Sequence, residues 1–185
     1  TTATLPTMPA VVVQPVATAA EMQAAVQAVF AECDVVIMAA AVADYHVAAP
    51  SDHKLKKSSP TSGLTLTLSQ NPDILAGLGA AKTHQLVVGF AAETNDLLAN
   101  AQQKLQKKHA DLLVANPVGG GRGFNQDTNT GWPLRPNQAP QAVPAASQEH
   151  VALVIFQTIS QVPVRFGARG HSGRRSSAGC TATAV

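Results

Sequence analysis

The run DVVIMAAAV (Asp34–Val42) has no polar side chain after its first residue. A continuous apolar run of this kind is typical of a strand that is buried on both faces, and such strands form parallel sheets covered by helices on either side. Two runs of the same type follow, QLVVGF (Gln85–Phe90) and DLLVAN (Asp111–Asn116). We therefore expect these three runs to be the central strands of a mainly parallel sheet.

Helical segments separate these strands. Helices are predicted over residues 19–32, 72–82, 95–110 and 147–161. Thr18 and Glu21, at the start of the first helix, have the spacing of a capping box. Asn71 and Pro72 suit the cap and the first turn of the second helix. The regular alternation of strands and helices predicts right-handed crossovers and a three-layer α/β domain of Rossmann-like type.

Three less regular segments complete the prediction. AVVVQPV (Ala10–Val16) is expected to be a short strand. LTLTLSQ (Leu64–Gln70) alternates with period two, so we expect a strand with one face in water. Pro117–Ala146 is rich in Gly, Pro and Asn, and is expected to be mostly loop with a short strand near Trp132.

Composition divides the chain near residue 161. Residues 1–161 contain nine basic and eleven acidic side chains, whereas the 24 residues from Val162 contain four arginines and no acid. We expect residues 1–161 to form one domain, and residues 162–185 to be a basic low-complexity tail that is disordered or foreign to it. A nucleic-acid-binding arm is the alternative interpretation of the tail, and we do not favour it.

Several function classes lack their usual signals. No apolar run reaches the roughly 18 residues that a membrane helix needs, and no signal peptide is recognisable. Cys33 and Cys180 are far apart, which argues against a disulfide scaffold or a zinc site. The histidines have no metal-binding spacing, and Ser58 and Ser59 lack a nucleophile-elbow context. We expect a cytoplasmic protein without a resident metal centre and without nucleic-acid or membrane partners.

Polar residues follow each of the central strands. Asp44 lies just beyond the first, Glu93 beyond the second, and Asn116 ends the third. In open α/β sheets, ligands bind beyond the carboxyl ends of the strands. The sequence therefore predicts a binding site at this edge of the sheet.

Two groups of lysines flank the expected site. Lys54, Lys56 and Lys57 suit either a solvated loop or the neutralisation of a polyphosphate. Lys104 and Lys108 are four residues apart and so share one helix face, with the same two interpretations. The nearby carboxylates suit Mg²⁺ binding, contact with a base or the capping of a turn, and the residue types alone do not choose between these roles.

The motifs AVADY, KLKK, NPDI, GFAAET and GFNQD, in this order and spacing, resemble those of bacterial phosphopantothenate–cysteine ligase. This is the CTP-dependent synthetase of coenzyme A biosynthesis, and the resemblance covers about Val12 to Trp132. It implies a ligase that joins 4′-phosphopantothenate to cysteine through an acyl cytidylate, with CTP as substrate and Mg²⁺ as cofactor. It also implies a homodimer, often fused to a decarboxylase half that carries FMN and is not represented here.

The same resemblance implies roles for individual residues. Lys54 is the expected catalytic residue, in contact with the triphosphate and the activated intermediate. The nucleotide site is expected to involve Met38, Ala39, Ala40, Asp44, Pro72, Asp73, Ile74, Leu75, Phe90, Lys104, Lys108 and Asn116. Within this set, Pro72–Leu75 and Phe90 would frame the cytosine and ribose, and the two lysines would bind phosphates. The resemblance assigns no residue to the metal.

The resemblance is incomplete at the N-terminus. The family carries a segment of SNxSSGKMG type that holds substrate, and nothing in the sequence matches it. We therefore expect a domain that lacks its first strand, loop and helix and is inactive alone. Two alternatives stay open: a non-catalytic nucleotide-binding or dimerisation fragment, and a fragment of a nicotinamide-dependent oxidoreductase, which the lysine clusters disfavour. The segment Leu64–Gln70 is expected to pair with its counterpart in a symmetric dimer.

Overall fold

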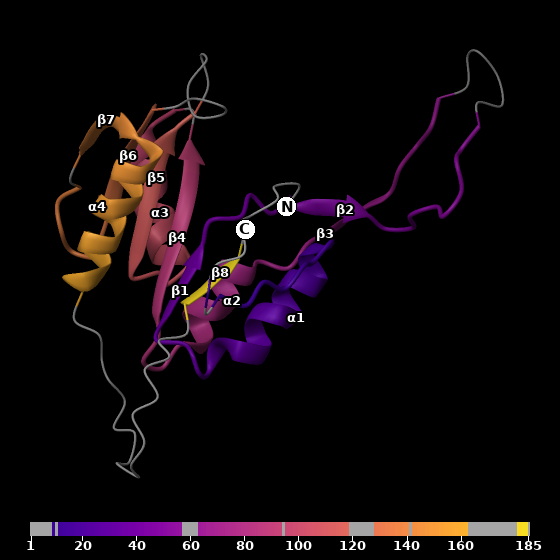
Figure 1. Cartoon of the computed structure of the whole chain (residues 1–185). Helices are drawn as coiled ribbons and strands as arrows, with labels where there is room; N and C mark the ends of the chain where they lie inside the picture. Colours follow the sequence, from indigo (N-terminus) through magenta and orange to yellow (C-terminus); the bar gives the residue numbers. More distant parts are fainter. Residues whose placement is uncertain are drawn as a thin grey trace, which may run out of the picture.

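The computed structural model describes residues 9, 11–56, 63–93, 95–118, 128–140, 142–162 and 181–184 of the 185-residue chain. Its elements are α1 (Ala19–Phe30), β1 (Val35–Met38), β2 (Tyr45–Val47), β3 (Leu68–Gln70), α2 (Ile74–Ala81), β4 (Leu86–Glu93), α3 (Leu97–Lys107), β5 (Leu112–Pro117), β6 (Thr128–Leu134), β7 (Val143–Ser147), α4 (Gln148–Ser160) and β8 (Thr181–Ala184). Figure 1 shows these elements as a body built around one sheet, with an arm that extends from it.

The body is organised around a six-stranded sheet of order β7-β6-β5-β4-β1-β8. The strands β8, β1, β4 and β5 run parallel to one another, while β6 pairs antiparallel with both β5 and β7. This arrangement confirms the predicted α/β fold with a mainly parallel sheet. It also brings the carboxyl ends of β1, β4 and β5 to the same edge.

Helices cover both faces of this sheet, which explains the continuous apolar runs. Val36 and Met38 of β1 pack in a cluster with residues of α1 and α2, whereas Ile37 packs in a cluster with residues of α4. Adjacent side chains of a strand point to opposite faces, so a strand covered on both sides must be apolar at every position. The helix α3 covers β4, β5 and β6 on the same face as α2, around Leu105 and Leu113.

The strand predicted over Ala10–Val16 was wrong in the described part, residues 11–16, which form no strand. Val12 is 94% exposed, and Val11 and Val13 are more than half exposed. A run of strand-forming residues needs a neighbouring ladder to satisfy its backbone groups, and none of the described strands pairs with this one. The segment therefore has the β-branched residues typical of a strand, but no neighbouring strand among the described residues to pair with.

The C-terminal end of the chain contributes an unexpected strand. Within the predicted basic tail, β8 pairs with β1 in parallel, with Val35 opposite Thr181 and Met38 opposite Ala184. The rest of the tail, residues 163–180 and 185, lies outside the described residues. The edge of β1 that faces away from β4 is thus occupied by a segment from the far end of the sequence (Figure 1).

A separate two-stranded sheet forms the base of the arm. β2 and β3 pair antiparallel, with Tyr45 opposite Gln70 and Val47 opposite Leu68, and the chain between them extends far from the body (Figure 1). The strand expected over Leu64–Gln70 is therefore real only at its end. Leu64, Leu66 and Leu68 are each more than half exposed, which leaves an alternating apolar row without cover among the described residues.

Helix caps were predicted with mixed success. The capping box at α1 is confirmed, because Thr18 Oγ1 accepts a hydrogen bond from the Glu21 amide at 3.1 Å and the Glu21 carboxylate accepts one from the Thr18 amide at 3.3 Å. The predicted cap of α2 was wrong. Asp73, rather than Asn71, is the N-cap, and its Oδ1 accepts from the Ala76 amide at 3.0 Å. The Asn71 side chain is engaged elsewhere, as described below.

Two glycines of α2 give a matched test of its packing. A Cβ on Gly79 would overlap the carbonyl oxygen of Lys108, whereas a Cβ on Gly77 would meet nothing within 4 Å. We expect Gly79→Ala to lower the free energy of unfolding by about 1–3 kcal/mol, because backbone must move to make room. Gly77→Ala is expected to raise it by about 0.4–1 kcal/mol, since alanine restricts the unfolded chain. Urea denaturation of both variants checks this, and equal effects would contradict the close approach of α2 to Lys108.

Candidate functional site

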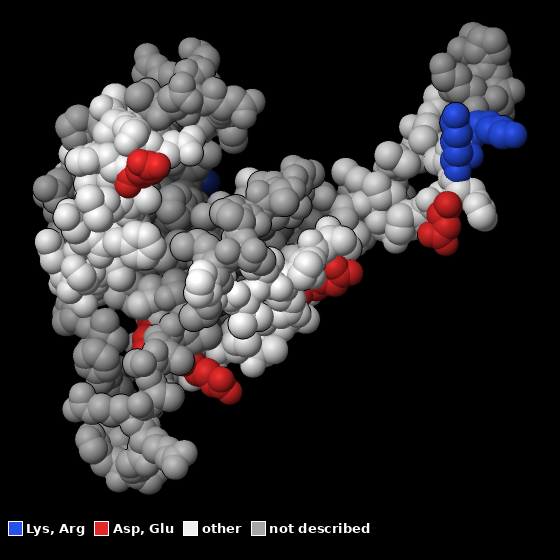
Figure 2. Space-filling view, viewed as in Figure 1, with Lys and Arg blue, Asp and Glu red and all other residues white. Residues whose placement is uncertain are grey.

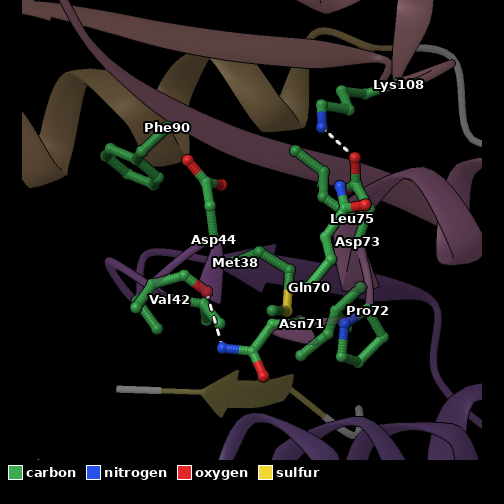
Figure 3. Close-up of a pocket in the computed structure, with 13 residues that line it drawn as sticks. Met38, Val42, Asp44, Gln70, Asn71, Pro72, Asp73, Leu75, Phe90 and Lys108 are labelled. Atoms are coloured by element: carbon green, nitrogen blue, oxygen red, sulfur yellow. Dashed lines mark hydrogen bonds and ion pairs between the residues drawn. The ribbon is translucent and has the colours of Figure 1, made fainter. Parts of the chain in front are cut away.

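A pocket of about 190 Å³ opens at the carboxyl edge of the sheet, where the sequence placed a site (Figure 3). It is lined by Met38, Ala40, Val42, Ala43, Asp44, Gln70, Asn71, Pro72, Asp73, Ile74, Leu75, Phe90 and Lys108. These residues come from the end of β1 and the loop after it, the connection from β3 to α2, the middle of β4 and the end of α3. The sequence predicted thirteen site residues, including the catalytic Lys54. Nine of these thirteen residues line the pocket.

One wall of the pocket is the loop from Ala39 to Asp44. Asn71 fixes this loop by two hydrogen bonds: its Nδ2 donates to the carbonyl oxygen of Ala43 at 2.8 Å, and its backbone amide donates to the carbonyl oxygen of Asp44 at 2.8 Å. The loop is therefore held against the β3–α2 connection. Sequence reasoning assigned Asn71 only to a helix cap, because the partner of its side chain lies 28 residues earlier and no local pattern reveals it.

The opposite wall is formed by Asp73 and Lys108. The Lys108 ammonium donates to Asp73 Oδ2 and forms an ion pair with it (Figure 3). Burial raises the pKa of the Asp73 carboxyl, but the hydrogen bonds from Lys108 and the Ala76 amide, with the charges of Lys108 and Lys107, outweigh burial and hold the pKa below its usual value. Asp73 is therefore a carboxylate at neutral pH.

The backbone of Lys108 is held where α3 ends. Its amide donates to the Lys104 carbonyl at 2.9 Å, and Gly79 packs directly against its carbonyl oxygen. The next residue, His109, has a left-handed φ of 50°, which turns the chain away into β5. The position of the Lys108 backbone is thus fixed by contacts, and its side chain is held by the ion pair with Asp73.

Between the two walls the lining is apolar. Leu75 of α2 and Phe90 of β4 supply this surface, and Figure 3 shows the Asp44 side chain extending to the side where Phe90 lies. The Asp44 carboxylate forms no ion pair with the described residues. An apolar surface beside backbone groups that are held in place suits a planar polar ring.

Four predicted site residues lie outside this lining. Ala39 belongs to the same loop without lining the pocket. Lys104 forms an ion pair with Glu93 at 2.6 Å. Asn116 is the residue before the last in β5, where its buried Oδ1 faces the position of Gly131 and has no partner among the described groups. The three strand ends therefore share an edge, as predicted, but not one cavity.

The fourth is Lys54, which lies on the arm. Lys54 and Lys56 are exposed, and Figure 2 shows basic side chains gathered toward the far end of the arm, away from the body. A single chain does not bring Lys54 into its own pocket. Lys57, the third lysine of this cluster, lies outside the described residues.

Residues 1–162 match the family model described as the DNA/pantothenate metabolism flavoprotein C-terminal domain. The chain belongs to this family. Relatives of the chain include the coenzyme A biosynthesis bifunctional protein CoaBC of Bacillus subtilis (strain 168), which is 41% identical over 84% of the chain. The protein of the same name from Escherichia coli (strain K12) is 47% identical over 68% of the chain. The chain spans only 38% and 32% of the length of these two relatives.

Two solved structures agree with the fold. The crystal structure of the C-terminal domain of a CoaBC protein has a TM-score of 0.61 at 30% identity, covering 78% of this chain and 62% of that one. The DNA/pantothenate metabolism flavoprotein from Streptococcus pneumoniae has a TM-score of 0.67 at 20% identity, covering 84% and 75%, and supports the fold alone. No helix in the described part of the chain has the length and apolar character needed to cross a membrane.

Proposed function

We propose that this chain is the CTP-binding part of a phosphopantothenate–cysteine ligase. The observation that carries the proposal is the pocket itself, in which the loop after β1 and the NPDI segment are joined by Asn71 at the carboxyl edge of the sheet. These are two of the motifs on which the family resemblance rests. The relatives named CoaBC act in coenzyme A biosynthesis, as their name states, which fits a ligase of that pathway.

The proposed reaction has two steps. The carboxylate of 4′-phosphopantothenate attacks the α-phosphorus of CTP, forming an acyl cytidylate and releasing pyrophosphate. The cysteine amine then attacks the acyl carbon, loses a proton and expels CMP, which leaves an amide. Both steps depend on positioning and on charge stabilisation rather than on a protein nucleophile. The described pocket lining, which contains no serine, cysteine or histidine, suits such chemistry.

The base is proposed to lie between Phe90 and the loop that Asn71 holds. Hydrogen bonds from a fixed backbone select a base by the pattern of its donors and acceptors, because a wrong base leaves buried groups unpaired. Asn71 gives the loop that rigidity through its two bonds of 2.8 Å.

Charge balance points to contributions from outside the single-chain pocket. The lining has two carboxylates, Asp44 and Asp73, against one ammonium, Lys108, whereas a nucleoside triphosphate is strongly anionic. We propose that Lys54 of a second copy supplies a missing cation, delivered by the arm in a symmetric homodimer. The exposed row of Leu64, Leu66 and Leu68 would be covered in the same assembly.

Mg²⁺ fits the same pocket as a partner of the triphosphate. This ion is usually held by one or two carboxylates together with substrate phosphates. Asp44, which forms no ion pair among the described residues, is the carboxylate we propose for it. When bound, the ion would reduce the repulsion between the triphosphate and the approaching carboxylate substrate. An FMN-dependent decarboxylase half, if fused, lies beyond this chain, which spans about a third of its bifunctional relatives.

Nucleotide preference tests the proposal on the chain as it exists. CTP with Mg²⁺ is expected to raise the melting temperature, because a ligand that binds only the folded state stabilises it, by about 2.7 kcal/mol at 100 times its Kd. ATP, GTP and NADPH are expected to give smaller shifts at the same concentration. Equal shifts from all the nucleotides would remove the case for a cytosine site, and a shift from NADPH alone would favour the oxidoreductase alternative.

A further inference from the structure

The cations that α3 directs toward the site are already paired. Lys108 is bound to Asp73 with its side chain only 21% exposed, and Lys104 is bound to Glu93 at 2.6 Å. Neither ammonium presents an unmatched charge to the pocket. An incoming phosphate must therefore compete with a carboxylate of the protein for Lys108, and this competition is a property of the site that the proposed function does not include.

The Asp73–Lys108 pair is held from both sides. Asp73 Oδ1 accepts from the Ala76 amide at 3.0 Å, so the carboxylate is fixed at the start of α2. The Lys108 backbone is fixed by its bond to Lys104 and by the close packing of Gly79. The two groups can separate without disturbing either helix only if the flexible Lys108 side chain swings away from Asp73.

We propose that Asp73 is an internal competitor for anionic ligands, and that a polyphosphate binds by taking its place on the Lys108 ammonium. The ligand class is the polyphosphate chain of a nucleotide or of an inorganic salt. This inference rests on the proposed function, since that function assigns the phosphates to this side of the pocket. A ligand with several charged oxygens displaces a single carboxylate, whereas a simple carboxylate does not, so the pair selects for polyphosphates.

The proposed exchange predicts that removing the charge of Asp73 increases the affinity for an anionic ligand. Asp73 lines the pocket, and removal of a lining residue that contacts the ligand weakens binding. If Asp73 instead competes with the ligand, its neutralisation must strengthen binding. Asn and Ser are both good N-caps, so Asp73→Asn and Asp73→Ser remove the charge while retaining the hydrogen bond that begins α2.

Titration calorimetry with inorganic tripolyphosphate, without Mg²⁺, tests the exchange. The Kd is expected to fall about two- to fivefold in Asp73→Asn and Asp73→Ser, the range of a partly exposed ion pair. In a Lys108→Gln background the same substitutions are expected to leave the Kd unchanged, because the ammonium for which Asp73 and the ligand compete is absent. Glu32→Gln is the matched control: it makes the same charge change in an exposed residue ahead of β1, at the opposite edge of the sheet, and is expected to leave the Kd unchanged.

Four outcomes would overturn the exchange, and the first three concern changes in the Kd. These are weaker binding in both Asp73 variants with unchanged melting temperatures, a gain that persists in the Lys108→Gln background, and a gain that Glu32→Gln reproduces. Undetectable binding to the wild type and to both Asp73 variants would also overturn it, because a freed Lys108 must bind the anion. Tripolyphosphate has no base, so failure of the CTP preference leaves this result standing, and failure here leaves a cytosine pocket standing.

Discussion

Leu66→Asp is expected to dissociate the proposed homodimer, raising its dissociation constant on the order of 10²–10⁴-fold. Leu66 is 52% exposed in the single chain and lies between Leu64 and Leu68 in the apolar row of the arm. Burial of a leucine contributes about 1.5–3 kcal/mol, and a symmetric interface contains each residue twice. An aspartate at this position also introduces two charges that the interface cannot solvate.

Sedimentation velocity of the chain at tens of micromolar measures this effect. Leu153→Asp is the control, because Leu153 is also exposed, at 54%, but lies on α4 in the body rather than on the arm. It is expected to leave the dimer intact. A wild-type chain that sediments as a monomer, or two variants that dissociate equally, would argue against an interface made by the arm.

Lys54→Gln is expected to reduce turnover of the whole enzyme by about 10²–10³, the typical loss when a group aimed at developing charge is removed. Lys57→Gln is expected to cost far less. The assay is pyrophosphate release with CTP, 4′-phosphopantothenate, cysteine and Mg²⁺, in a protein that includes the parts of the relatives that this chain does not span. Mild and similar losses at both lysines would mean that the cluster is only a solvated loop.

Mixed dimers test whether Lys54 serves the partner's pocket. Lys54→Gln leaves a subunit with an intact pocket, and Lys108→Gln leaves one with an intact arm. If the arm acts across the dimer, each mixed dimer contains one complete site, and a random mixture recovers about a quarter of the wild-type rate. If Lys54 acts within its own chain, mixing recovers nothing, because each subunit then carries one of the two defects.

The central sheet could be predicted because the burial of its strands on both faces is visible in their uninterrupted apolar sequences. β1, β4 and β5 are covered by helices on both faces, and only uninterrupted apolar runs satisfy both. The residues just beyond those runs then had to lie at one edge. This argument predicted that Asp44, Glu93 and Asn116 share an edge, whereas Met38 and Phe90 were assigned to the site by the family resemblance.

The rest depended on partners that no local pattern contains. Val11–Val13 consists of residues that favour strands, but none of the described strands pairs with it. Thr181–Ala184 has a weaker strand pattern, yet it forms a strand because it pairs with the edge of β1. Asn71 shows the same limit within the site, since its hydrogen bond joins residues 28 positions apart. The Asp73–Lys108 pair joins residues 35 positions apart, so the sequence could not show that Lys108, which was expected to bind phosphates, is paired with a carboxylate.

The pairing of β8 with β1 has a consequence for the order in which the chain folds. Its two partners, such as Val35 and Thr181, are separated by most of the sequence, so loop-closure entropy makes this contact form late. During synthesis β1, β4 and β5 emerge from the ribosome before β8 exists. Among the described strands, β8 is the one that pairs with the outer edge of β1, so within this chain that edge gains its partner last. An open strand edge is prone to edge-to-edge association, so the pairing of β8 is expected to protect the folded sheet from aggregation at the outer edge of β1.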